Sequence, residues 1–530
     1  MLFTSLSFFM FFIIGLIIYY LVPKKFQWIV LLVASGVFYA SFSWKFFFFI
    51  LFTIITVWLS GVLIDKITEK QKLQLEVEGI SPEDKKAIKQ ANKRKKKLIL
   101  ALCIVANVGI LFFLKYANFM ISNAQGLLGL FGFKTDKIVL NLILPLGISF
   151  YSFQSIGYIL DVYWGKTKAE KNIAKFALFV SFFPQIIQGP ISRHSDLAPQ
   201  LTAEHKFDYN KLIKGVLLIL WGLVKKLLIA DYLSTAVNNG FGDVASLNGL
   251  QANFTVLFYL IQDLMDFSGC IDIAMGVAEC FGIELAPNFE RPYFSLTISE
   301  YWRRWHMTLG SWFKDYLFYP ISISKFSQKL GKFSKKIGKN SYLSKQVPAI
   351  FGLSIVWLTT GIWHGASWNY ILWGAYYGIL VILGIVFKPV FTKIIEKLKI
   401  NVNHWAYKIF QWIRTIWLIC VGRIIFRANS LLDAWILFTK TFDFPFKYHF
   451  QSLEMLLPSM YTLTIAGIAL AVVLIVDLIK EFKKVSVRNF IINHGYTLQT
   501  ITICIMIVVI IFFGSYGPGF SAENFIYMQF

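Results

Sequence analysis

The stretch Phe46–Ile64 reads FFFFILFTIITVWLSGVLI and contains no charged side chain. An apolar run of about 20 residues is long enough to cross the hydrocarbon core of a bilayer as an α-helix. Further stretches come near this length without Asp, Glu, Lys or Arg: Leu2–Val22, Phe26–Trp44, Leu98–Leu114, Ile138–Leu160, Phe176–Ile191, Val347–Trp363, Ala366–Phe387, Met455–Val476 and Tyr496–Gly517. Three more apolar segments are interrupted by polar residues: Lys211–Ala230, Gln251–Phe281 and Trp405–Phe426. The pattern predicts about eleven to thirteen membrane-spanning or re-entrant helices.

The composition agrees with this prediction. Hydrophobic residues make up 57% of the 530 residues and charged residues 15%, whereas a soluble domain has roughly 45–50% apolar and about 25% charged residues. These values exclude a soluble enzyme, and they exclude a disordered chain, which needs low hydrophobicity. We therefore expect an all-α polytopic membrane protein.

The net charge of +23 comes from 52 Lys and Arg against 29 Asp and Glu. The basic residues lie in short segments between apolar runs, as in the cytoplasmic loops of membrane proteins, so we expect no nucleic-acid partner. We therefore expect a multi-pass protein of the cytoplasmic (inner) membrane. Its segments Asp65–Lys97 and Lys325–Lys345 would lie in the cytoplasm, and its N-terminus would lie on the outer side of the membrane. Ser81–Lys97 is expected to form a solvated helix that Ser81 caps.

Four acidic residues lie in the apolar segment 259–281. A carboxylate in such surroundings must be paired, hydrated or protonated. The candidates for pairing are the basic residues that flank nearby apolar runs, and Gly269 is a possible break in the helix. The acids are Asp263, Asp266, Asp272 and Glu279, and the expected partners are Arg303, Arg304, Lys225 or Lys226.

Two histidines stand in aromatic surroundings. His306 follows Trp302 and Trp305 in a pattern of aromatic residues at three- and four-residue steps, which predicts one interfacial helix from residue 300 to 317. His364 lies between two spans without formal charge. A neutral imidazole there is suited to proton transfer, but a packed histidine would have the same sequence, so both interpretations stay open.

Motifs for other chemistry are missing from the sequence. There is no H-x-x-x-H pair and no C-x-x-C pair among the five cysteines, so we expect neither a metal site nor a disulfide framework. No G-x-S-x-G elbow of a serine hydrolase occurs either.

Several motifs together resemble the membrane-bound O-acyltransferase (MBOAT) family. They are WRRWH (302–306), WFKDYL (312–317), WHGASWN (363–369), LPLGISFYSFQ (144–154), FPQIIQGPISR (183–193), DFSGCIDIA (266–274), PNF (287–289), RPY (291–293), RIIFRA (423–428) and FIYMQF (525–530). The resemblance is strongest to the bacterial branch that contains the membrane subunits of alginate and peptidoglycan O-acetylation. It implies a helical bundle around a central tunnel.

The resemblance also implies residue roles. His364 and His306 would be the catalytic residues, with His364 as general base or transient acyl acceptor. Residues for binding the donor would be Arg303, Arg304, Lys314, Asn369 and Trp363. The chain would divide into N-terminal transmembrane helices (1–64), a basic cytoplasmic loop (65–97) and a catalytic membrane core (98–530).

The function implied is transfer of an acetyl group from cytoplasmic acetyl-CoA, with no bound cofactor, to an extracytoplasmic polysaccharide. A separate SGNH-hydrolase-like transferase would be the partner, and membrane lipids surround the chain. One alternative is D-alanyl transfer to teichoic acids from a carrier protein. Alternatives from other classes are a transporter of lipid-linked glycans and a scaffold of a secretion complex.

Overall fold

The computed structural model describes residues 1–516 except 134, 135, 137, 339, 340, 444–452, 454, 455, 457 and 458. The motif 525–530 lies outside the described residues, as do parts of the segments Lys325–Lys345, Met455–Val476 and Tyr496–Gly517. The described chain is all helical and contains no strand. It divides into two compact units, residues 1–215 with 277–286 and residues 216–276 with 287–530.

The first unit is built from the N-terminal helices. They are α1 (Leu6–Leu21), η1 (Lys24–Phe26), α2 (Gln27–Ala40), α3 (Phe46–Glu76), α4 (Pro82–Leu130), α5 (Ile148–Trp164), α6 (Ile173–Ser181) and α7 (His194–Thr202). The helices α8 (Tyr209–Leu223) and α10 (Gly249–Cys280) contribute residues to both units.

The second unit holds the remaining helices. They are η2 (Val224–Ala230), α9 (Asp231–Gly242), η3 (Pro292–Phe294), α11 (Ile298–Arg304), α12 (Met307–Phe313), η4 (Lys314–Phe318), α13 (Tyr319–Ser322), α14 (Lys325–Ile337), α15 (Tyr342–His364), α16 (Trp368–Val386), α17 (Lys388–Lys397), α18 (Trp405–Arg427), α19 (Leu431–Lys440), α20 (Met460–Leu478), η7 (Ile479–Lys483), α21 (Val487–Asn493) and α22 (Tyr496–Phe513).

Eight helices of the described chain are long and apolar enough to cross a membrane: α3, α4, α10, α15, α16, α18, α20 with η7, and α22. The chain is therefore a multi-pass membrane protein. The expected eleven to thirteen segments also included shorter apolar stretches, and several of these form helices of sub-spanning length, such as α1 with 16 residues. A straight helix of that length rises about 24 Å, which is less than the bilayer core.

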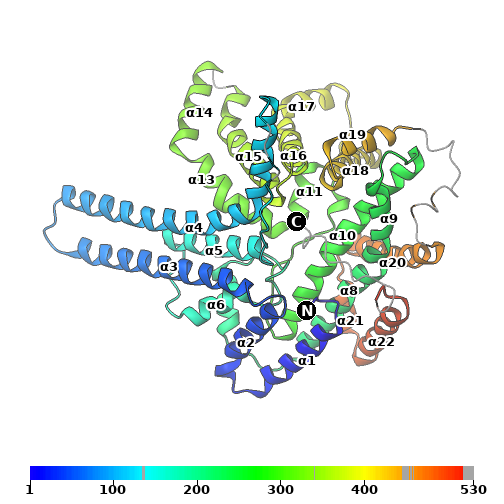
Figure 1. Cartoon of the computed structure of the whole chain (residues 1–530), viewed down its shortest axis with the longest axis horizontal. Coiled ribbons are helices and arrows are strands. Elements are labelled where there is room, and N and C mark those ends of the chain that lie inside the picture. The colour runs from blue at the N-terminus through cyan, green and yellow to red at the C-terminus, as the bar shows by residue number, and fades with distance from the viewer. Residues whose placement is uncertain are drawn as a thin grey trace. The chain divides into compact units, whose positions relative to one another are not determined.

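The basic segment 65–97 extends two membrane helices. α3 continues to Glu76 and α4 begins at Pro82, so the two helices lie side by side as a long hairpin (Figure 1). The Ser81 side chain accepts a hydrogen bond from the Asp84 N–H at 3.0 Å, which satisfies one of the free amides at the start of α4. The predicted cap and solvated helix are confirmed, but this helix is continuous with the membrane-crossing part of α4.

Glycines set the crossing of α8 and α10. A Cβ at Gly222 would lie 2.5 Å from the Gly269 carbonyl oxygen, and a Cβ at Gly269 would lie 2.8 Å from that of Gly222. Both distances are far inside van der Waals contact, so only glycine permits this approach. The prediction of a break at Gly269 is wrong, because α10 is continuous and the glycine serves close packing.

Candidate functional site

The predicted helix from residue 300 to 317 is broken at His306, and that prediction is therefore wrong. α11 ends at Arg304 and α12 begins at Met307. His306 has a φ of 46°, in the left-handed region that non-glycine residues seldom occupy. The segment 288–290 holds the break open, since the Glu290 N–H donates to the Arg304 carbonyl and the Met307 N–H to the Asn288 carbonyl, both at 2.9 Å.

The break turns the His306 ring into the protein, where 2% of the residue is exposed. Nδ1 lies 3.1 Å from Oδ1 of Asn288. The Phe267 ring meets the imidazole edge to face at a centroid distance of 4.9 Å. Burial lowers the pKa of His306 to about 3, because the charged form loses its hydration. The ring is therefore neutral at physiological pH.

His364 is the last residue of α15 and is 6% exposed. Aromatic rings surround its imidazole, with centroid distances of 4.7 Å to Trp373 and 5.1 Å to Phe426. The glycine that follows it does not open space for a ligand, since a Cβ at Gly365 would lie 2.3 Å from the Tyr370 ring. The small residues around His364 thus permit close approach of α16.

Trp363 connects the two histidines. Its ring centroid lies 6.4 Å from that of His306 and 4.8 Å from that of His364. The two imidazoles therefore cannot be farther apart than these two distances together. His306 and His364 lie on either side of the basic segment 325–345 in the sequence, and both rings lie beside the buried indole of Trp363.

A buried ion pair lies near the segment that carries His306. Arg423 of α18 contacts Asp263 of α10 at 2.6 Å and donates to the Tyr301 hydroxyl at 2.8 Å. Its guanidinium also lies 4.2 Å from the Trp305 ring centroid, a cation–π distance. Asp263 and Arg423 are 2% and 3% exposed. The pair ties α10 and α18 to α11, next to the break that carries His306.

Two more acids of α10, Asp266 and Asp272, also have basic partners. Asp272 contacts Lys225 at 2.7 Å and Asp266 contacts Lys226 at 2.5 Å. The predicted pairing with Lys225 and Lys226 is confirmed. Asp263 pairs instead with Arg423, and Arg304, one of the alternative partners expected, contacts Glu300 and Glu481 at 2.8 and 3.2 Å.

The remaining candidate residues lie in different surroundings. Arg303 in α11 and Lys314 in η4 are exposed. Asn369 is buried at the start of α16, and its Nδ2 donates to the carbonyl oxygens of Ala428 at 2.8 Å and Ile425 at 3.3 Å. Both amide hydrogens thus bind the end of α18. In this arrangement Asn369 fixes the helix that carries Phe426 against the His364 ring.

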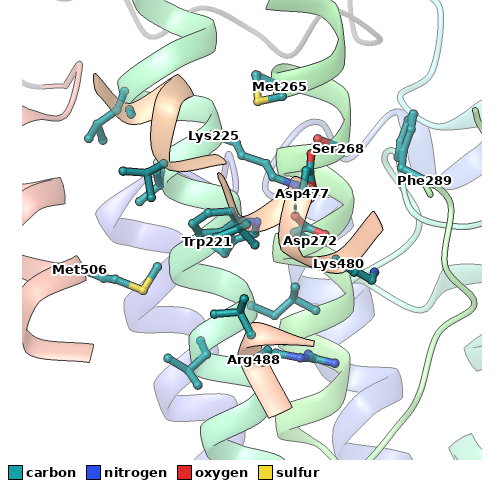
Figure 2. A pocket seen from close by; sticks show the side chains of 18 of the residues that line it. Trp221, Lys225, Met265, Ser268, Asp272, Phe289, Asp477, Lys480, Arg488 and Met506 are labelled. Carbon is teal, nitrogen blue, oxygen red and sulfur yellow. Dashed lines mark hydrogen bonds and ion pairs between the residues drawn. The ribbon is translucent and has the colours of Figure 1, made fainter. Parts of the chain in front are cut away.

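A cavity of about 780 Å³ opens within the second unit. Its walls come from α8 with η2, α10, the segment 287–292, α20 with η7, α21 and α22. Figure 2 shows Lys225 and Asp272 pointing toward one another inside it, with Asp477 beside them. Asn288 also lines the cavity, so one wall of the cavity includes the residue whose side chain contacts His306.

No group of three or more His, Cys, Asp or Glu side chains able to hold a metal ion occurs among the residues that the structure describes. The five cysteines are free thiols. The site is thus formed by two buried imidazoles, aromatic rings and buried ion pairs. Such a site can exchange protons and exclude water, which general acid–base chemistry requires.

Comparison with known proteins agrees with this class of site. The sequence pattern of the membrane-bound O-acyltransferase family matches residues 169–335. The chain is 32% identical over 449 residues to "Probable alginate O-acetylase AlgI" of Azotobacter vinelandii, covering 84% of this chain and 78% of that protein. It is 32% identical over 366 residues to the peptidoglycan O-acetyltransferase of Helicobacter pylori, with 64% and 63% covered.

A third relative is more distant. The teichoic acid D-alanyltransferase of Bacillus subtilis is 27% identical over 293 residues, which cover 54% of this chain and 70% of that protein. The fold is that of a multi-pass membrane protein. The chain belongs to the membrane-bound O-acyltransferase family, and it is an acyltransferase.

Sequence reasoning missed two residues of the site. Asn288 belongs to the PNF motif and Arg423 to RIIFRA, and neither was predicted as a site residue. The available signal for Arg423 was a guanidinium inside an apolar span, which implies a buried acid as partner. Nothing in the local sequence of Asn288 points to His306.

Proposed function

We propose that this chain is an acetyltransferase of the cytoplasmic (inner) membrane. It takes an acetyl group from cytoplasmic acetyl-CoA and serves the O-acetylation of an extracytoplasmic polysaccharide, through a separate SGNH-hydrolase-like transferase. The observation that carries the proposal is the contact of both buried histidines with Trp363. The printed names of the relatives, which include alginate and peptidoglycan acetylation, support the polysaccharide acceptor.

The chemistry of the proposal needs a base and a protected site. A hydroxyl oxygen attacks the thioester carbonyl carbon, the hydroxyl proton passes to an imidazole nitrogen, and the carbon–sulfur bond breaks. The leaving thiolate then takes up the proton. His364 is proposed as the base, or as a transient acyl acceptor that would be attacked by the hydroxyl in a second step, while His306 orients the donor or completes the proton relay.

Burial supports this use of the two rings. A neutral imidazole is the form that accepts a proton, and the low pKa of His306 keeps it in that form at pH 7. The aromatic rings of Trp373 and Phe426 exclude water from His364, which protects an acyl intermediate from hydrolysis.

The donor is proposed to arrive beside exposed basic residues. Arg303 and Lys314 are exposed near the break, and phosphate groups of coenzyme A are suitable partners for such side chains. Helix α14 carries lysines of the segment 325–345, which we assign to the cytoplasmic face. Arg304 contacts Glu481, so its part in donor binding would require that pair to separate.

The direct test is acetyl-CoA consumption by purified protein in detergent with a model hydroxyl acceptor. We expect His364→Ala and His306→Ala to lose at least about 100-fold in turnover, the lower range for a positioned general base. His494→Ala is the matched control, because His494 is an exposed histidine at the end of α21. Turnover by both buried-site variants at the rate of the control would refute the proposal.

D-alanyl transfer is the second candidate, favoured by the likeness to the teichoic acid D-alanyltransferase. It differs in the donor, which would be a carrier protein with a phosphopantetheinyl arm. Supplying each donor to the same purified protein separates the two. Transfer from acetyl-CoA supports the first candidate, and transfer only from a D-alanyl carrier replaces it with the second.

A further inference from the structure

The carboxamide of Asn288 lies against His306 in a fully buried setting. Asn288 is 1% exposed. Its Oδ1 accepts from the Thr308 N–H at 3.0 Å and from the Thr308 hydroxyl at 2.8 Å, and lies 3.1 Å from Nδ1 of His306. Three polar groups thus converge on one oxygen.

This convergence determines which hydrogens are present. The backbone N–H of Thr308 can only donate, so the side-chain atom of Asn288 that faces it must be the oxygen and not the amide nitrogen. An amide oxygen only accepts, so the contact with His306 is a hydrogen bond only when Nδ1 carries the hydrogen. A neutral imidazole carries one N–H, which leaves the lone pair on Nε2.

The surroundings keep the ring neutral. Groups that face His306 include the Phe267 ring from α10, the Trp363 ring from α15 and the Asn288 amide, and these three carry no charge. Burial, rather than a nearby charge, is the cause of the low pKa. One tautomer of one charge state is therefore favoured.

We infer that Asn288 is a positioning residue that fixes His306 as the Nδ1–H tautomer and so makes Nε2 the nitrogen of this ring that can accept a proton. The inference rests on the proposed function, in which His306 takes part in acyl transfer. The backbone of Asn288 supports the same geometry, because its carbonyl accepts from Met307 at the start of α12. A change of the side chain leaves that backbone bond available.

The first test reads the tautomer without any activity. Purified protein labelled with ¹⁵N in the histidine rings is measured by solid-state NMR, and the His306→Gln variant assigns the signals by subtraction. We expect a protonated Nδ1 and an unprotonated Nε2 for His306 at pH 7. A protonated Nε2, or an even mixture of tautomers, would overturn the inference.

Three variants separate positioning from general stability. Asn288→Leu removes the acceptor at similar volume and should give a tautomer mixture, with kcat about 10–100-fold lower and KM little changed. Asn288→Asp retains an acceptor and adds a negative charge, so the pKa of His306 should rise by about 1–3 pH units and the acidic limb of the kcat profile should move with it. Thr308→Val is the control, since it removes one hydroxyl from Oδ1 and leaves the contact with His306.

The outcomes distinguish this inference from the proposed function. A single Nδ1–H tautomer in Asn288→Leu would overturn the positioning role. A changed tautomer with unchanged kcat would support positioning and refute the role of His306 in acyl transfer. Where Asn288→Leu does not fold, the tautomer of the unmodified protein and the pH profile of Asn288→Asp decide the question.

Discussion

Removal of the Arg423 guanidinium should destabilise the second unit strongly. In the unmodified protein Arg423 lies 2.6 Å from the Asp263 carboxylate, and the two residues are 3% and 2% exposed. In Arg423→Met this carboxylate would remain in the interior without its partner. Breaking one side of a buried ion pair costs about 3–5 kcal/mol, because the remaining charge is neither hydrated nor compensated. The variant also loses the hydrogen bond to Tyr301 and the contact with Trp305.

The double variant provides the matched comparison. Asp263→Leu with Arg423→Met removes both charges of this pair, and an apolar replacement of a whole pair is often neutral or stabilising. We therefore expect the double variant to melt above Arg423→Met and closer to the unmodified protein. The assay is thermal unfolding in detergent, followed by the fraction that stays monodisperse in size-exclusion chromatography.

Two results would refute this reasoning. Arg423→Met could have the same melting temperature as the unmodified protein, which would mean that the pair does not contribute to stability. The double variant could melt below Arg423→Met, which would mean that packing and not the uncompensated charge determines the loss. Arg423→Lys retains the charge but not the planar guanidinium, so its melting temperature should lie between those of Arg423→Met and the unmodified protein.

Three further predictions concern packing, protonation and charge. Gly222→Val should prevent folding or lower the melting temperature sharply, because its side chain would overlap the α10 backbone at Gly269, and Gly15→Ala in α1, which has open space, is the control; equal melting of both would contradict the close crossing. The pKa of His306 is lowered by folding, so its neutral form contributes stability above the unfolded value of about 6.5, and this contribution is lost as the pH falls toward about 3. The stability advantage of the unmodified protein over His306→Gln should accordingly be larger at pH 7.5 than at pH 5, and an advantage that grows on acidification would show the reverse shift. Charge reversal of the lysines in 325–345 should raise the KM for acetyl-CoA, and an unchanged KM would limit this segment to a role in topology.

The spans were predictable because hydropathy is a local property. Each run such as Phe46–Ile64 needs only its own side chains to favour a membrane, and the structure forms a long helix there. The cap at Ser81 was predictable for the same reason, since an N-cap is decided within one turn. The division at residues 64 and 97 stays a prediction.

The break at His306 was not predictable from local pattern. The aromatic spacing continues through residues 302–316 as if one helix ran there. The segment 288–290, however, donates a backbone hydrogen bond to the residue before the break and accepts one from the residue after it. Tertiary contacts override a periodic pattern when they satisfy the backbone groups that the helix would have used. The same holds for Asp263, whose partner Arg423 lies 160 positions away.

Both histidines were predicted from the sequence as candidate site residues, and the structure supplies their spatial relation. Neither WRRWH nor WHGASWN states that the two motifs meet, and Trp363 is the residue at which they do. The role expected for Asn369 stays a prediction, and its amide hydrogens bind α18 in this structure. Asn288 is the buried amide that contacts a histidine of the site.

Acyl transfer in the cell should depend on His364, the buried histidine next to Trp363 in the sequence. The measurement is the O-acetyl ester content of extracytoplasmic polysaccharide from cells that carry His364→Ala at the native locus, with membrane abundance of the protein matched to cells carrying His494→Ala. The account predicts ester content at the level of a deletion strain for His364→Ala and a normal level for His494→Ala. Normal acetylation in the His364→Ala cells would contradict it.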